Sequence, residues 1–121
     1  MTRERRAAER HGHRSEAIAA WWLRLKGYRI VARRYKTAAG EIDLIVRRGR
    51  VLVFVEVKAR ADFRAAADAV SPRQQHRIAR AASQFLATRP DLADLDQRFD
   101  ALLIVRRTWP RHLPDAWRIG A

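Results

Sequence analysis

The segment from Val51 to Lys58 constrains the fold more than any other part of the chain. It is the most β-like stretch of the sequence, rich in branched and aromatic residues. Alternate residues of a strand face opposite sides, so its four valines face one way, and Leu52, Phe54, Glu56 and Lys58 face the other. The sequence therefore predicts a buried strand whose carboxyl-terminal end carries an acid and a base.

A second strand is predicted just before it. Glu41 to Val46 alternates, with Ile42, Leu44 and Val46 on one face and Glu41, Asp43 and Ile45 on the other. Arg48-Gly49 is predicted as a tight turn that joins the two strands. The pattern indicates an antiparallel hairpin with two carboxylates on one side of its first strand.

The pairing across this turn predicts which side chains meet. If Arg47 lies opposite Arg50, Asp43 lies opposite Phe54. Directly opposed residues share a face, so one side of the sheet would carry Glu41, Asp43, Glu56 and Lys58. On this register Asp43 and Glu56 form a diagonal pair with backbones about 7 to 8 Å apart, close enough for both side chains to reach one ion.

The other elements are predicted from periodicity. Ile18, Trp22 and Leu25 follow helical spacing from Ser15 to a glycine cap at Gly27. Residues 28–35 read as a strand followed by a turn at 37–40. Ser71-Pro72 begins a second helix that ends before Pro90, and residues 99–105 and 116–119 are predicted as strands. The order αβββαββ indicates an α/β or α+β sheet domain.

The length of 121 residues suits one domain, and 48% hydrophobic residues are enough for a packed core. Residues 1–12 are Arg-rich and without periodicity, so they are predicted to be a mobile basic arm or the frayed start of a helix. Residues 13–121 are predicted to form the single domain.

The charge points to a polyanionic partner. Lys and Arg number 26 against 13 Asp and Glu, a formal net charge of +13. Such a surface attracts phosphate backbones, so nucleic acid is the leading partner and an acidic membrane surface the weaker one. Almost all of this charge is arginine, and a bias in genome composition would give the same pattern.

Several classes of site are excluded or unsupported. With no cysteine, disulfides, zinc thiolate sites and thiol nucleophiles are ruled out. The four histidines are scattered and form no metal-ligand spacing. The amino terminus lacks an apolar stretch, and the longest apolar run, Val51 to Val55, is far too short to span a bilayer. We therefore expect a cytoplasmic protein with no membrane association.

Clustered carboxylates repel one another unless a cation compensates their charge. Mg²⁺ prefers oxygen ligands and commonly takes only one or two protein carboxylates. Such an ion would polarise a phosphate and activate water, while Lys58 would orient that water or stabilise charge on the phosphate. The hairpin is therefore a candidate Mg²⁺ or Mn²⁺ site for cleaving a phosphodiester.

The pattern Glu41-Ile42-Asp43, then Phe54-Val55-Glu56-Val57-Lys58, resembles the core of the PD-(D/E)XK nuclease superfamily. More closely, Gly40 to Ile45 followed by Val53 to Lys58 looks like the YraN-like family of small proteins, and more distantly like archaeal Holliday-junction resolvases. The likeness covers most of the chain, including Arg98-Phe99-Asp100 before a strand. One departure is Ile42, which stands where the superfamily has a proline before the first acid.

This resemblance implies a restriction-endonuclease-like αβββαβ(β) core with a mixed central sheet flanked by helices. It implies that Asp43 and Glu56 are metal ligands, that Lys58 is the catalytic lysine, and that Glu16 is an additional first-helix acid of the site. The activity implied is Mg²⁺- or Mn²⁺-dependent cleavage of nucleic acid. The resemblance does not specify the substrate, and our own hypothesis is DNA in branched or damaged form. The likeness to resolvases also implies a homodimer.

Alternatives to each site residue stay open. Glu56 with Lys58 or Arg60 would also serve as a structural ion pair, and an acid such as Glu16 is favoured in a first helical turn whatever the function. Phosphate contacts are assigned to Arg60, Arg73, Gln75 and Arg77, for which a solvated surface is the alternative. The tryptophans at 21, 109 and 117 are candidates to stack on bases, whereas Trp22 lies on the apolar stripe. The rival function is a non-catalytic nucleic-acid-binding module of the same fold.

Overall fold

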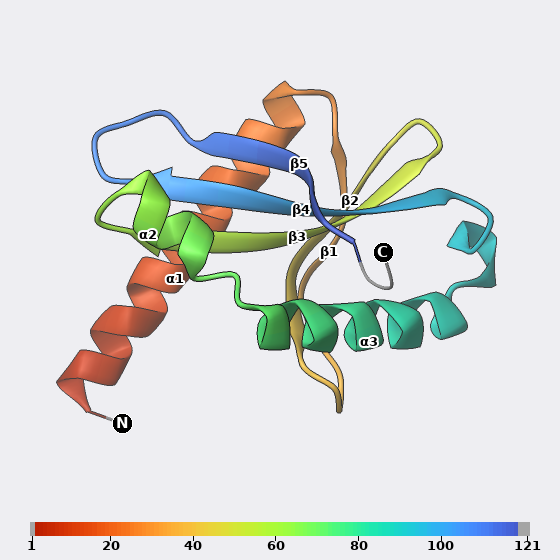
Figure 1. Cartoon of the computed structure of the whole chain (residues 1–121), viewed down its shortest axis with the longest axis horizontal. Helices are drawn as coiled ribbons and strands as arrows, with labels where there is room; N and C mark the ends of the chain where they lie inside the picture. Colours follow the sequence, from red (N-terminus) through yellow and green to blue (C-terminus); the bar gives the residue numbers. More distant parts are fainter. Residues whose placement is uncertain (1, 119–121) are drawn as a thin grey trace.

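A computed structural model describes residues 2–118, and for residues 4–11 it describes the backbone alone. The elements run in the order α1 (Arg3–Leu25), β1 (Arg29–Lys36), β2 (Glu41–Arg48), β3 (Val51–Arg60), α2 (Phe63–Asp68), α3 (Pro72–Thr88), the 3₁₀ helix η1 (Pro90–Leu92), β4 (Asp96–Val105) and β5 (Arg111–Trp117) (Figure 1).

The strands form one mixed sheet in the order β1-β2-β3-β4-β5. Neighbours pair antiparallel except β3 and β4, which run parallel. Parallel neighbours need a crossover, and α2 and α3 occupy it. The expected fold class is confirmed: a mixed α/β domain whose five-stranded sheet is flanked by helices and is compatible with a restriction-endonuclease-like core.

Each face of the sheet has its own core. α1 covers one face, where Ala19, Ala20 and Leu23 pack with the strand residues Val53 and Val55. α3 covers the other face (Figure 1), and its buried stripe packs on Leu52 and Phe54, a stripe made by Ile78, Ala81, Ala82 and Phe85. The central strand β3 is therefore buried from both sides, as its alternation predicted.

The helix boundaries follow from capping. Ser71 accepts a hydrogen bond from the Gln74 N–H and Pro72 opens α3, which confirms the predicted start. Gly27 takes a positive φ of 90°, the conformation expected of a glycine after a helix. α1 begins at Arg3 rather than Ser15, so the backbone of residues 3–12 is helical. The mobility expected of this segment stays a prediction, and Met1 lies outside the described residues.

The register of the β2–β3 hairpin corrects the predicted one. Arg48 pairs with Val51, so the turn is Gly49-Arg50 and not Arg48-Gly49. Gly49, with φ 61°, holds the first central position, where a type II′ turn requires glycine. Each β2 residue therefore pairs with a β3 residue two positions beyond the predicted partner. A shift of two residues keeps the predicted residues of β3 on the same face as their partners, and it places Asp43 beside Glu56, just past the last pair of the ladder.

The faces of β2 also differ from the prediction. Ile42 joins Ile45 in the core under α3, whereas Leu44 and Val46 lie in the core under α1. Regular alternation would have put Ile42 with Leu44. The alternation breaks at Asp43, where the ladder with β3 stops at Leu44 and the Asp43 carboxylate accepts the Val57 N–H instead, at 2.8 Å.

Two further elements differ from expectation. α2 was not predicted; Asp62 caps it by accepting the Ala65 N–H at 2.7 Å. The last strand begins at Arg111, earlier than the predicted 116–119, and it contains Pro114. Proline is tolerated there because β5 is an edge strand. Ile119 lies outside the described residues.

A buried polar network ties β5 to the sheet. The Asp100 carboxylate is fully buried and accepts two hydrogen bonds from Arg98, at 2.8 and 2.9 Å. It also contacts His112 Nε2 at 2.6 Å and accepts the Asp115 N–H at 2.9 Å, while Arg98 donates to the Tyr28 hydroxyl. His112, which had no predicted role, is therefore a structural residue.

None of the helices formed by residues 2–118 is both long enough and apolar enough to cross a membrane.

Candidate functional site

Asp43, Glu56 and Lys58 converge where β2 and β3 stop pairing. Lys58 Nζ lies 3.3 Å from Glu56 Oε1, and the Asp43 carboxylate bonds the backbone of Val57 between them. Glu56 is only 4% exposed. The break in the ladder explains this arrangement, because an aspartate that bonds the partner strand with its side chain turns its carboxylate toward that strand.

Gln74 completes the support of Glu56. Its side-chain amide donates to Glu56 Oε1 at 3.1 Å from the first turn of α3. Gln75, which the sequence predicted to contact phosphate, donates its side-chain amide to the Val70 carbonyl at 3.1 Å. The sequence contained an indication of this role for Gln74. Gln74 stands four residues before Ile78, the first buried residue of the helical stripe, and therefore lies on the same face of α3.

Glu16 reaches the same place from α1. It lines a cavity of about 320 Å³ together with Asp43, Lys58 and Arg60. Glu16 Oε1 is buried and receives no hydrogen bond from any residue that the structure describes. Its ion pair with Arg34 is long, at 3.7 Å from the arginine Nε. This atom therefore has unused capacity to bind a cation or a donor.

A second cavity meets the first at Asp43. It measures about 430 Å³ and brings Asp43 and Glu56 together with Arg73 and Arg77 of α3. Glu41 lies on its wall. Of the side chains predicted to contact phosphate, Arg60, Arg73 and Arg77 therefore line the cavities that contain the acids, whereas Gln75 lines neither.

Burial and mutual repulsion disfavour the charged acids. Burial, followed by the charge of Asp43, raises the pKa of Glu56 to about 9, although Lys58 acts in the opposite direction. Burial and then Asp43 raise the pKa of Glu16 to about 7, against the lowering effect of Arg34. At neutral pH and without a cation, Glu56 therefore holds a proton.

This donor set fits a hard divalent cation of the magnesium type. Among the described residues no three acidic or histidine side chains form a ready-made cage. Mg²⁺ needs no such cage, since it commonly uses one or two carboxylates and takes its other ligands from water and substrate phosphate. Asp43 and Glu56 would supply those two oxygen donors, and Glu16, whose Oε1 receives no hydrogen bond from a described residue, lines the adjoining cavity together with Asp43.

Comparisons with known proteins agree on the family. A sequence model described as "Uncharacterised protein family UPF0102" matches residues 15–104. A UPF0102 protein of Parvibaculum lavamentivorans is 64% identical over 112 residues, which cover 93% of this chain and 84% of that protein. A UPF0102 protein of Rhodopseudomonas palustris is 57% identical, with 94% and 84% covered. One of Brucella canis is 48% identical, with 99% and 95% covered.

The matched region begins just before Glu16 and includes Asp43, Glu56, Lys58 and Gln74, so the whole candidate site lies inside it. The match over most of its length and the high identity to several relatives lead to one conclusion: this chain belongs to the UPF0102 family.

Proposed function

We propose that this protein is a metal-dependent endonuclease of the PD-(D/E)XK type that hydrolyses phosphodiester bonds in nucleic acid, with DNA in branched or damaged form as its substrate. The observation that carries the proposal is the meeting of Asp43 and the buried Glu56 with Lys58, whose Nζ lies 3.3 Å from Glu56 Oε1. The charge of Asp43 disfavours ionisation of the buried Glu56, and a bound cation would stabilise both carboxylates in their charged form.

Asp43, Glu56 and Glu16 would hold Mg²⁺ or Mn²⁺. When bound, such an ion polarises the phosphate and lowers the pKa of an attacking water. Gln74 holds the Glu56 carboxylate in place through its hydrogen bond at 3.1 Å. Lys58 places an ammonium group beside the reacting phosphate, where it orients water and offsets the negative charge that develops.

The surrounding charge suits the substrate. Arg73 and Arg77 line the cavity with Asp43 and Glu56, and Arg60 lines the cavity with Glu16 and Lys58. Arginine binds phosphate in a bidentate manner and stays charged at any physiological pH. With a net charge of +13, the chain attracts a polyanion before any specific contact forms. The cytoplasm is the compartment we propose, and the homodimer implied by the resemblance stays a prediction.

A cleavage assay tests the proposal. Labelled single-stranded, duplex, flapped and four-way DNA are incubated with the protein with and without Mn²⁺, beside Asp43→Asn and Glu56→Gln. Both variants are expected to lose nicking while they keep phosphate affinity. Asp68→Asn, which removes the same charge from an exposed position on α2, is the matched control and should cut normally.

The rival function is a non-catalytic nucleic-acid-binding module, for which the Glu56–Lys58 contact would be only a structural ion pair. Salt-sensitive binding without metal-dependent cleavage of any of these substrates would favour it. Cleavage that persists in both site variants would show that the chemistry occurs elsewhere.

A further inference from the structure

A further cavity lies beside the candidate site and has a different character. This groove measures about 720 Å³, and its walls come from α1, the end of β3 and the β4–β5 turn. It presents four arginines to its lumen and no acidic side chain. The lining that matters here consists of Arg14, Ile18, Arg60, Ile104, Arg106 and Arg107. We call it the arginine groove.

The arginine groove is continuous with the site. Ser15, Ala59 and Arg60 line both the groove and the cavity that holds Glu16, Asp43 and Lys58. The parallel pairing of β3 with β4 causes this, because both strands end at the same edge of the sheet, with Arg60 opposite Val105. Crevices at the carboxyl ends of parallel strands are common binding places in α/β sheets.

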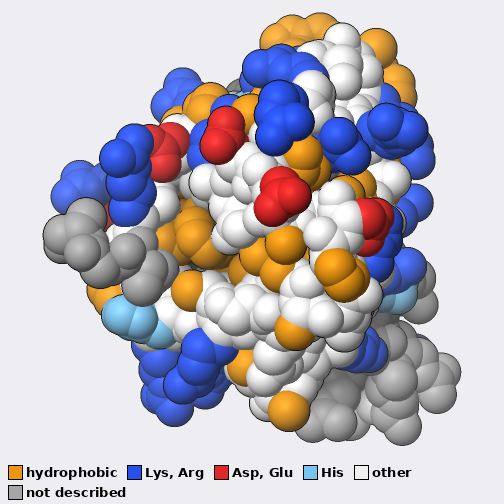
Figure 2. All heavy atoms as spheres, turned by 90° about the vertical axis from the view of Figure 1, so that its right-hand side faces the viewer, with side chains coloured by type: hydrophobic (Ala, Val, Ile, Leu, Met, Phe, Trp, Pro, Cys, Tyr) orange, Lys and Arg blue, Asp and Glu red, His pale blue; other side chains and the backbone are white. Residues whose placement is uncertain are grey.

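Among the side chains that the structure describes, none is an acidic partner for the arginines of the groove. Arg60 donates to the Ala59 carbonyl at 2.7 Å, but no ion pair joins Arg14, Arg106 or Arg107 to any described side chain. Like charges converging on one concavity repel one another, and a bound polyanion relieves that repulsion. The opposite end of the molecule differs, because acidic side chains lie among its lysine and arginine side chains (Figure 2).

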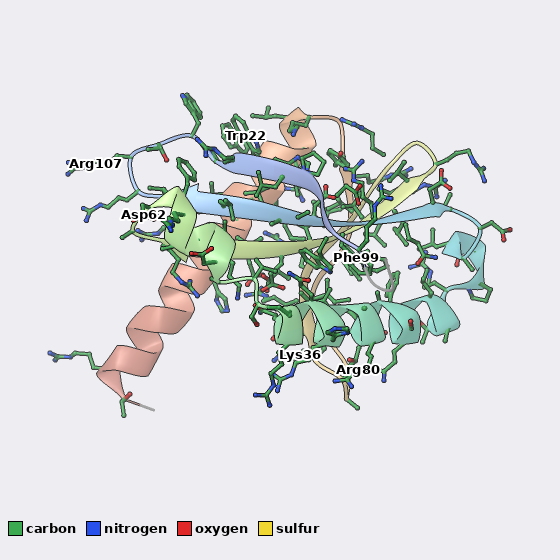
Figure 3. All side chains as sticks on the ribbon, in the orientation of Figure 1. Trp22, Lys36, Asp62, Arg80, Phe99 and Arg107 are labelled. Carbon is green, nitrogen blue, oxygen red and sulfur yellow. The ribbon has the colours of Figure 1, made fainter. Side chains whose placement is uncertain are left out.

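Apolar and aromatic groups lie beside these charges. Ile18 and Ile104 line the groove, and Trp22 follows Ile18 by one helical turn of α1. Trp109, 72% exposed, follows the turn that carries Arg107, and its ring lies 5.7 Å from that of Trp22. Figure 3 labels Arg107 on this turn and Trp22 on α1. The two elements that wall the groove thus continue into an aromatic shelf made by the exposed Trp109 and the part-buried Trp22.

We propose that the arginine groove and the Trp22–Trp109 shelf bind a single strand of nucleic acid that leaves the candidate site, so that the substrate has an unpaired arm. This deepens the proposed function and rests on it for the identity of the polymer. Alternating phosphate and base contacts suit a single strand, whose unstacked bases have free faces for an aromatic ring. A duplex keeps its bases stacked inside and offers only its backbone and groove edges to this concavity.

Binding without metal tests the proposal separately from cleavage. The affinity of an oligothymidylate is measured by fluorescence anisotropy over a series of salt concentrations, with EDTA present. Each phosphate contact to a single strand contributes about 0.7 to the slope of log affinity against log salt. The double variant Arg14→Ala, Arg106→Ala is therefore expected to lower this slope by about 1.4.

The matched control is Arg29→Ala, Arg50→Ala, which removes the same charge from exposed positions near the far end of β3. Its slope should equal that of the unmodified protein. An equal loss of slope in both double variants would mean a general effect of net charge and would overturn the proposal. If Arg14→Ala, Arg106→Ala lowered the salt slope for duplex DNA as much as that for oligothymidylate, the single-strand assignment would be overturned. The absence of measurable oligothymidylate binding by the unmodified protein would overturn it as well.

The aromatic shelf has its own variants. Trp109→Ala is expected to lower oligothymidylate affinity about tenfold, because stacking on one base contributes that much or more. Trp109→Phe keeps a stacking ring and should restore most of the affinity. If the Ala and Phe variants bound oligothymidylate with equal affinity, Trp109 would not be part of the binding surface. Because this binding is measured with EDTA present, a failure of the proposed cleavage would leave the result intact.

Discussion

Replacing Glu56 by glutamine tests the electrostatics of the site while nearly preserving its shape. Burial and the nearby Asp43 charge raise the pKa of Glu56 from 4.5 to about 9. Between these values the folded protein holds a proton that the unfolded chain has released. The free energy of unfolding therefore falls as pH rises through this window, with proton uptake on folding as the cause.

The size of the effect follows from the pKa. Each pH unit above 4.5 lowers the free energy of unfolding by about 1.4 kcal/mol. The Glu56 carboxyl therefore lowers the stability of the metal-free protein by about 3 kcal/mol at pH 7. Glutamine has no proton to take up, and it keeps a carbonyl oxygen that can accept the hydrogen bond from Gln74. We expect Glu56→Gln to match the unmodified protein near pH 4.5 and to exceed it by about 3 kcal/mol at pH 7.

Urea unfolding over this pH range, with EDTA present, measures the difference. Glu41→Gln, at an exposed position of β2, is the matched control and should change stability by less than about 0.5 kcal/mol at every pH. Adding Mn²⁺ should stabilise the unmodified protein more at higher pH, because the metal replaces the proton, and should stabilise Glu56→Gln less. The reasoning is refuted if the variant is the less stable protein at pH 7 and the difference does not change with pH.

Three other perturbations have definite expected outcomes. The pKa of Glu16, about 7, predicts that Mn²⁺ affinity rises as pH increases through neutrality. Glu16→Gln should remove that part of the pH dependence in calorimetric titrations. An unaltered pH profile would exclude Glu16 as a ligand. Asp100→Asn should lower the free energy of unfolding, measured in urea, by about 3 to 5 kcal/mol, because it leaves the part-buried Arg98 without its carboxylate partner. A loss below about 1 kcal/mol would contradict the network described above. Gly49→Ala should cost about 1 kcal/mol through its positive φ of 61° alone, since an added Cβ meets no atom within 4 Å; a larger loss, with altered spectra, would indicate a steric cause instead.

The pH dependence of Asp100 has the opposite sign from that of Glu56. Burial acts to raise the pKa of Asp100, but hydrogen bonds from His112, Arg98 and the Asp115 N–H outweigh it and hold the pKa below its usual value. A lowered carboxyl pKa adds stability above the unfolded value near 3.8, and this stability is lost as pH falls through the folded value. Protonation of Asp100 at a pH below 3.8 should therefore weaken the contacts with His112 and the Asp115 N–H that join β5 to the sheet.

Periodicity alone predicted the elements that carry the site. The alternation of Val51 to Lys58 placed Glu56 and Lys58 on one face of a buried strand, and the structure has them there. The stripe at Ile78 and Phe85 predicted α3, and the Ser71-Pro72 signal predicted where it begins. These features are local: side-chain spacing and capping act within a few residues, so the sequence determines them without reference to the rest of the fold.

Only the tertiary structure decided how these elements meet. Two registers of the β2–β3 hairpin have the same parity, so the hydrophobic pattern does not distinguish them, and the choice between them depends on the conformation of Gly49. The break at Asp43, the use of Gln74 rather than Gln75, and the groove shared by α1, β3 and the β4–β5 turn all depend on contacts between residues far apart in the chain. The sequence alone predicted which acids and which lysine form the candidate site, and long-range packing determined their distances, their burial and the raised pKa values of Glu56 and Glu16.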